Sequence, residues 1–169
     1  PENEVWLLDY KGLVVAYNSG YLTDKQLIIP EAERFSQRLS QAMSFQIMPS
    51  DWEKLRRAFP VADSALLEIY QRLNTKLFTY ATSRDAQVMI ERETVTSLQD
   101  LLGLLGSCPS PWPNVLTAIQ KGWASWAKLN HKTLDWSWNF QPLEPFESIQ
   151  DLLRNSSVLM IAGSWHNEL

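Results

Sequence analysis

The sequence predicts an α-rich α+β fold, in which a helical insertion is flanked by short parallel strands of an incomplete α/β sheet. Two short apolar runs, residues 27–29 and 158–162, lie toward opposite ends of the chain. Each has the composition of a buried strand in a parallel sheet covered by helices. Between them, apolar side chains recur mostly at helical spacing. Strands this short leave unpaired edges, so we expect sheet partners from the rest of a parent polypeptide or from another chain.

The elements are predicted from this patterning in chain order. Strands are expected over residues 4–9, 13–17 and 27–29, with a turn at 18–20. Helices are expected over residues 31–43, 49–59, 63–82, 96–105, 114–130 and 146–153, with N-caps at Ser50 (Glu53 completing a capping box), at Asp63 or Ser64, and at Asn114. Two further strands are expected over residues 134–140 and 158–162, whereas residues 85–93 fit either a strand or a continued helix. The prolines of residues 108–113 exclude regular structure there.

The composition is that of a folded protein with one domain-sized core. Of the 169 residues, 45% are apolar and 20% are charged. The net charge of −4 gives no bulk cationic field, although it remains compatible with a local basic groove. No apolar run reaches the roughly 18 residues of a membrane span.

Cysteine and histidine are too sparse to build a metal site. The single cysteine, Cys108, excludes an internal disulfide and a thiolate cluster. His131 and His166 lack metal-ligand spacing. A reduced, cytoplasmic protein without a metal site in this segment is therefore the simplest interpretation.

Tryptophan is unusually frequent, with eight residues in the chain and five of them between positions 112 and 138. Packing in a core or groove explains these rings most simply. The alternative is base stacking on a single nucleic-acid strand, which requires exposed rings beside cations.

Two short polar signatures follow the apolar runs. Glu31 and Glu33 come after 27–29, where carboxylates in nucleotide hydrolases hold magnesium or orient the attacking water. The structural alternative is a helix start, because Pro30 followed by acids suits a first helical turn. Ser164 follows the second run through Ala162 and Gly163, and an ordinary strand exit explains that segment equally well.

The order of these signals resembles the DinG/XPD branch of superfamily 2 DNA helicases. That family has an Asn-His-x-x-Leu stretch, an apolar strand ending in Asp-Glu-Ala-His, a helical insertion called the Arch domain, a Trp-containing strand followed by Pro-Leu, and a strand ending in Thr-Ser-Ala-Thr-Leu. The chain has, in the same order, the segments 18–22 (Asn-Ser-Gly-Tyr-Leu), 27–33 (Leu-Ile-Ile-Pro-Glu-Ala-Glu), 136–143 (Trp-Ser-Trp-Asn-Phe-Gln-Pro-Leu) and 158–164 (Val-Leu-Met-Ile-Ala-Gly-Ser). The resemblance implies flanking motor-domain strands over 1–33, an Arch-like helical domain over 34–133, and a strand–helix–strand return to the motor domain over 134–169.

The motifs depart from the family at important positions. Pro30 stands where the family has its magnesium-linked Asp, and Glu33 stands where it has His. Glu31 matches the water-orienting Glu, and Ser164 matches the final Thr of the second motif. Without the Asp, the resemblance implies a weakened or inactive ATPase, because positioning and charge neutralisation dominate phosphoryl transfer. The chain also lacks a Gly-x-x-x-x-Gly-Lys-Ser/Thr loop and the family's four-cysteine cluster, so ATP and magnesium would be cofactors of a longer parent only.

The resemblance further implies that the helical part forms one wall of a tunnel for single-stranded DNA. The candidate cations for phosphate contact are Arg56, Arg57, Lys121 and Lys128, together with Lys54 and Lys76. Lys121 and Lys128 are expected on one helix with Trp123 and Trp126. Solvated helix faces explain these cations as well as DNA contact does.

Two other classes of function compete with this interpretation. The first is a small α-rich interaction subunit of a nucleoprotein or other assembly, with the Trp-rich stretch as its interface. The second is a free-standing enzyme, for which no nucleophile–base or metal constellation is readable. Asp135 and His131 near Lys132 are most simply a polar turn.

Overall fold

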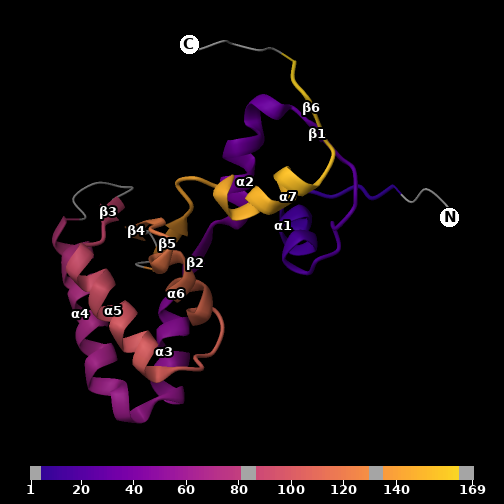
Figure 1. The fold of residues 1–169 in the computed structure, drawn as a ribbon. Coiled ribbons are helices and arrows are strands. Elements are labelled where there is room, and N and C mark those ends of the chain that lie inside the picture. Colours follow the sequence, from indigo (N-terminus) through magenta and orange to yellow (C-terminus); the bar gives the residue numbers. More distant parts are fainter. Residues whose placement is uncertain (1–4, 81–86, 130–134, 164–169) are drawn as a thin grey trace. The chain divides into compact units, whose positions relative to one another are not determined.

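The computed structural model describes residues 5–80, 87–129 and 135–163, and it divides the chain into two compact units. Unit 1 combines Pro1–Met43 with Leu143–Leu169, and unit 2 is the intervening Ser44–Pro142. Within the described residues, helices and small sheets together form a mixed α+β protein (Figure 1). None of the helices in this part of the chain is long and apolar enough to cross a membrane.

Unit 1 is organised around two strands that lie far apart in the sequence. Strand β1 (Leu27–Pro30) pairs in parallel with β6 (Val158–Ile161), placing Ile29 beside Met160 and Pro30 beside Ile161. The resemblance to the helicase family implies that residues 29 and 161 lie on near-neighbouring strands of one sheet, and the pairing of β1 with β6 agrees with this. Unit 2 is thus inserted between two strands of one sheet.

Helices cover one face of this strand pair. They are α1 (Tyr10–Asn18), the 3-10 helix η1 (Ala32–Arg34), α2 (Phe35–Met43), the 3-10 helix η3 (Glu147–Ile149) and α7 (Gln150–Asn155). Ile29 shares their core with Phe35, Leu39 and Ile149, all buried. The predicted helix over 31–43 is confirmed in its main part, with Phe35 and Leu39 on the buried stripe as expected.

The prediction that these strands are apolar and buried on both faces is wrong for this chain. Ile28 is 66% exposed and Leu159 is 57% exposed, and the two are paired positions on the same face. Ile161 on that face is also exposed. The strand pair therefore has one partly covered face, on which Ile29 is buried and Met160 is 38% exposed, and one open apolar face.

The strands predicted over 4–9 and 13–17 are also wrong. Residues 5–9 have no regular structure, and α1 occupies 10–18. The Asp9 carboxylate accepts a hydrogen bond from the Gly12 backbone N–H at 2.6 Å, which is a standard N-cap. Leu13 and Ala16, three positions apart, then face the core. An apolar run that resembles a strand by composition is thus helical because of its cap and its burial at helical spacing.

Unit 2 contains an antiparallel sheet that the helical prediction for 34–133 lacked. Its strands are β2 (Phe45–Ile47), β3 (Gln87–Met89), β4 (Ala124–Leu129) and β5 (Trp136–Gln141), in the spatial order β2-β5-β4-β3. The strand predicted over 134–140 is confirmed as β5, with Trp136, Trp138 and Phe140 buried on one face. It pairs with β2 and β4, however, and so belongs to unit 2 instead of returning to unit 1. Residue 134 lies outside the described residues.

Four α-helices and one 3-10 turn complete unit 2: α3 (Pro49–Ala58), η2 (Pro60–Ala62), α4 (Asp63–Tyr80), α5 (Arg92–Leu105) and α6 (Trp112–Gln120). Figure 1 shows α4 and α5 side by side, and α5 also packs on α6. The undecided segment 85–93 contains β3 followed by the start of α5, and its first two residues are outside the described part.

Three details of the predicted helices in unit 2 need correction. Helix α3 begins at Pro49, where the Asp51 carboxylate accepts the Met48 backbone N–H at 3.0 Å, so Ser50 is not its cap. Helix α6 begins at Trp112 because Pro113 is tolerated in a first turn. It also ends at Gln120 instead of continuing to residue 130, because Gly122 adopts a left-handed φ of 66° and the chain enters β4.

The core of unit 2 accounts for most of its tryptophans. Trp52, Trp112 and Trp138 are fully buried, with the rings of Trp52 and Trp112 4.8 Å apart and those of Trp52 and Trp138 stacked at 6.3 Å. Trp112 donates its indole N–H to the Asp51 carbonyl at 3.1 Å. Trp136 is also buried and Trp123 packs against the same cluster, so these rings have a structural role. Trp126 is not part of this cluster.

Candidate functional site

The candidate site lies in unit 1, where two parallel strands end at the same edge. Pro30 and Ile161 are paired at the carboxyl ends of β1 and β6. Glu31 therefore leaves the sheet beside the segment that leads through Ala162 to Gly163. Ligands of α/β proteins bind outside the carboxyl ends of strands. The structure thus brings the end of β1 next to the end of β6, and Ser164 lies outside the described residues.

The backbone turns sharply at Glu31. Its φ of 52° and ψ of 50° are left-handed values that few residues other than glycine adopt. The Glu31 carbonyl then accepts the Arg34 backbone N–H at 2.9 Å, closing η1 before α2 begins. This turn separates Glu31 from the regular helix, so the simple helix start suggested by Pro30 and the following acids does not describe its geometry.

The Glu31 carboxylate forms an ion pair with an arginine of α2. The Arg38 guanidinium forms an ion pair with Glu31 and also lies over the Tyr10 ring, 5.8 Å from its centroid. Both charged side chains are partly exposed, at 37% for Arg38 and 47% for Glu31. Sequence reasoning missed Arg38, because only the turn at residue 31 brings α2 back over the end of β1. Glu33 is exposed, one residue beyond Ala32.

These residues do not fit a magnesium nucleotide. Magnesium takes oxygen ligands in near-octahedral geometry. Pro30 offers no side-chain ligand at the position where the family has Asp, and Glu31 is already paired with Arg38. Within the described residues, no group of three or more His, Cys, Asp or Glu side chains converges on a common point. The arrangement is a structured turn at a ligand-binding edge, without the groups that hold a metal and phosphates there.

The segment 18–22 contributes packing and an exposed ring. Leu22 is buried, while Tyr21 is 64% exposed and meets Trp6 edge to face at 6.4 Å. The Lys25 ammonium lies 5.6 Å from the centroid of the Trp6 ring. This small exposed aromatic cluster was not predicted, because Trp6 was placed in a strand.

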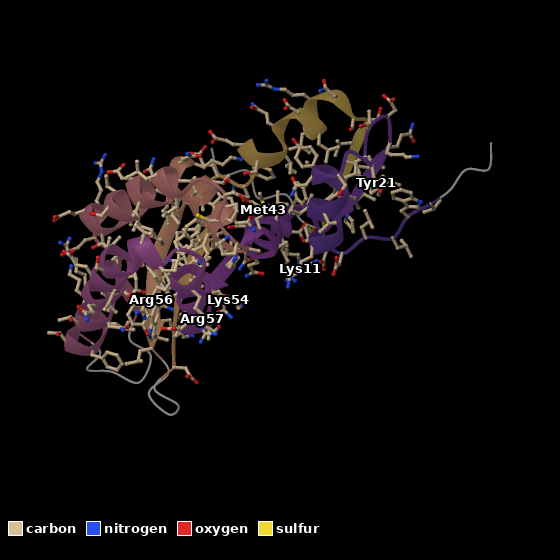
Figure 2. All side chains as sticks on the ribbon, turned by 90° about the horizontal axis from the view of Figure 1, so that it is seen from below. Lys11, Tyr21, Met43, Lys54, Arg56 and Arg57 are labelled. Atoms are coloured by element: carbon tan, nitrogen blue, oxygen red, sulfur yellow. The ribbon has the colours of Figure 1, made fainter. Side chains whose placement is uncertain are left out.

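The predicted phosphate-contacting cations do not form a single patch. Figure 2 shows Arg56 and Arg57 on α3 together with Lys54. Lys121 is the C-cap residue of α6, and Lys128 lies on β4 instead of on a common helix with Lys121. With Lys76 on α4, the predicted cations are spread over four different elements of unit 2.

Arg56 is committed to carboxylates. It binds Asp63 through two hydrogen bonds, Nε to Oδ1 at 2.6 Å and Nη2 to Oδ2 at 3.2 Å, and Glu53 through Nη1 at 3.0 Å. The hydrogen bonds from Arg56 lower the pKa of Asp63, and the bond to Asp63 raises the pKa of Arg56. Lys54 pairs with Asp51 at 3.0 Å, and Lys76 pairs with Glu91. Arg57, Lys121 and Lys128 are exposed, and no ion pair is found for them within the described residues.

Comparison with known proteins adds no assignment to this geometry. No protein-family model matches the chain, and no curated protein sequence matches it.

Proposed function

We propose that this chain is a segment of a DinG/XPD-like DNA helicase, comprising an insertion that guides single-stranded DNA and flanking motor strands whose motifs are weakened. The observation that carries the proposal is the parallel pairing of β1 with β6 across the whole of unit 2. A chain that leaves a parallel sheet at one strand, folds a separate unit and returns to the adjacent strand has the topology that the resemblance implies.

The open face of the strand pair supports the same proposal. Ile28, Leu159 and Ile161 are exposed on it. Parallel strands occur almost always in sheets covered on both faces, and an isolated pair is marginally stable in water. Further strands and a covering helical layer, supplied by a longer polypeptide, would bury these side chains.

The motor of this protein is proposed to be catalytically weak. Pro30 cannot ligate a metal, and Glu31 is engaged by Arg38. Arg38 neutralises the carboxylate that the resemblance would assign to orienting water. Removing one preorganised charge contact typically lowers a rate by about two to three orders of magnitude. A DNA-guiding role does not require hydrolysis within this segment.

The alternative is a non-catalytic interaction subunit of a larger assembly. The exposed apolar face of β1 and β6 favours it as much as it favours a missing motor layer, because either partner would cover the same side chains.

The full reading frame of the gene separates the two proposals. A helicase requires a phosphate-binding Gly-x-x-x-x-Gly-Lys-Ser/Thr loop before this segment and a second motor domain after it. We expect both. A reading frame that contains neither would overturn the helicase proposal and leave the interaction subunit.

A further inference from the structure

We infer that the open face of the unit 2 sheet is a binding platform for a single-stranded polynucleotide, centred on Trp126. The inference names the surface that would contact the DNA in the proposed function. It rests on the proposed function only for the role of guiding DNA. The evidence is the composition of the sheet face itself.

The strand register defines the platform. Residues paired across antiparallel strands point to the same face, and alternate residues point to opposite faces. Ala127 and Trp138 are paired and buried toward the core, so Trp126 and its partner Asn139 face the other way. Gln46 on β2 and Met89 on β3 continue this row across all four strands. The outward positions are Gln46, Gln87, Met89, Ala124, Trp126, Lys128, Ser137, Asn139 and Gln141, and we call them the outer face.

The outer face has the chemistry of a base-binding surface. Trp126 is partly exposed at the centre of the row, and Met89 beside it is 68% exposed. The Asn139 side-chain amide donates to the Trp126 carbonyl at 3.4 Å and to the Ser137 hydroxyl at 3.1 Å, which holds it beside the ring. Single-stranded nucleic acids bind proteins by stacking bases on aromatic side chains and by hydrogen bonds to base edges, and four-stranded antiparallel sheets are one scaffold that does this.

The charge of the outer face suits a polyanion. The chain contains 19 acidic and 15 basic residues, yet none of its carboxylates occupies an outer-face position. Lys128, next to Trp126 on the same face of β4, is the single formal charge among those nine positions. It is exposed, and within the described residues no ion pair neutralises it. In an acidic chain, a neutral and cationic face around an indole ring fits a phosphate backbone with exposed bases.

Fluorescence anisotropy of the intact chain with labelled oligonucleotides tests the platform. Oligothymidylate and oligouridylate of about 16 nucleotides distinguish DNA from RNA, and a duplex of the same length serves as the comparison. We expect either single strand, or both, to bind more tightly than the duplex, with binding that weakens between about 50 and 200 mM salt. Preferential duplex binding, or no salt-sensitive binding, would overturn the inference.

Variants locate the binding on the outer face. Trp126→Ala should weaken binding about 5- to 100-fold, the range found for a stacking aromatic. Lys128→Gln should lower the slope of log affinity against log salt by about 0.7, the value for one phosphate contact on a single strand. Lys11→Gln is the control, because Lys11 is an exposed cation on α1 of unit 1, outside this face. It should leave affinity and slope unchanged.

Two further variants distinguish a loss of binding from a loss of the fold. Trp126→Phe keeps an aromatic ring on the strand and should retain most of the affinity. Met89→Glu replaces an exposed side chain with a carboxylate and should weaken binding without disturbing the core. If Lys128→Gln and Met89→Glu both bind as the unaltered chain does, the platform is wrong even where DNA binding persists elsewhere. Loss of binding in both would support it, even if the reading frame contained no motor.

Discussion

Pro30 and Ile161 are paired at the ends of two parallel strands, although the whole of unit 2 separates them in the sequence. The pairing fixes which side chains of β1 face the helices of unit 1. Ile29 is 6% exposed and contributes to that core, whereas the preceding Ile28 is 66% exposed on the opposite face. Adjacent isoleucines on one strand therefore provide a matched pair for testing the register.

Ile29→Ala should lower the free energy of unfolding by about 2–5 kcal/mol, because it leaves a cavity among packed side chains. Ile28→Ala should change it by less than about 0.5 kcal/mol in this chain. Urea unfolding followed by circular dichroism measures both. Equal losses for the two variants would contradict the register. In a longer protein that covers the open face of β1 and β6, we expect the cost of Ile28→Ala to rise toward that of Ile29→Ala.

Trp138 tests the aromatic core of unit 2. It is fully buried, stacks on Trp52 and contacts Phe140, so Trp138→Ala should cost about 3–5 kcal/mol of stability. Trp138→Phe should cost much less, because the buried Trp138 indole N–H has no hydrogen-bond partner among the described residues and its removal relieves a desolvation cost of about 1–3 kcal/mol. Leu104→Ala, at an 85% exposed position, is the control. Denaturant titration that ranks the two Trp138 variants equally would contradict this account.

The spacing of apolar residues predicted the elements in which the buried side chains recur regularly along one segment. The alternation of Trp136, Trp138 and Phe140 identified β5, and the spacing of Phe35 and Leu39 identified α2. That the two terminal strands are neighbours was also predicted, but from the resemblance to a helicase family in which both strands belong to one sheet. When one face of an element is buried, apolar residues recur at a fixed spacing, and this spacing is visible in the sequence.

The remaining features depend on single backbone positions or on contacts between distant residues. Gly122 ends α6, so Trp126 lies on the open face of strand β4 instead of on the expected helix. Asp9 turns an apolar run into α1 by capping it. The pairing of Arg38 with Glu31 follows from the left-handed turn at residue 31. The spacing of apolar and charged residues in the sequence does not predict such a turn. The sequence therefore predicted two neighbouring strand ends, whereas the ion pair between Glu31 and Arg38 could be found only in the three-dimensional structure.

The Asp63 carboxylate makes the stability of unit 2 sensitive to pH in the acid range. The hydrogen bonds from Arg56 lower the pKa of Asp63 below its ordinary 3.8. A depressed pKa in the folded state means that the stabilisation is fully present above 3.8 and is lost as the pH falls through the folded-state pKa. Asp63→Asn should therefore flatten the acid limb of the stability profile, with its largest effect at neutral pH. Urea midpoints measured at neutral pH and below pH 3.8 check this. Asp100→Asn, at an exposed residue of α5, is the control. A parallel displacement of the whole profile in Asp63→Asn, with an unchanged acid limb, would contradict the role of the ion pair.

Magnesium and ATP should not stabilise this chain. A ligand that binds only the folded state raises the free energy of unfolding by about 2.7 kcal/mol when its concentration is one hundred times its dissociation constant. Pro30 supplies no ligand, Glu31 is held by Arg38, and the sequence contains no Gly-x-x-x-x-Gly-Lys-Ser/Thr loop. Thermal unfolding with and without millimolar magnesium and ATP should therefore give the same midpoint. Arg38→Ala frees Glu31 and should change stability by less than about 1 kcal/mol, because the pair is partly exposed. We expect it to leave the nucleotide response absent, since Pro30 remains. A midpoint that rises with ATP in the unaltered chain and rises further in Arg38→Ala would show that this edge of the sheet binds nucleotide after all.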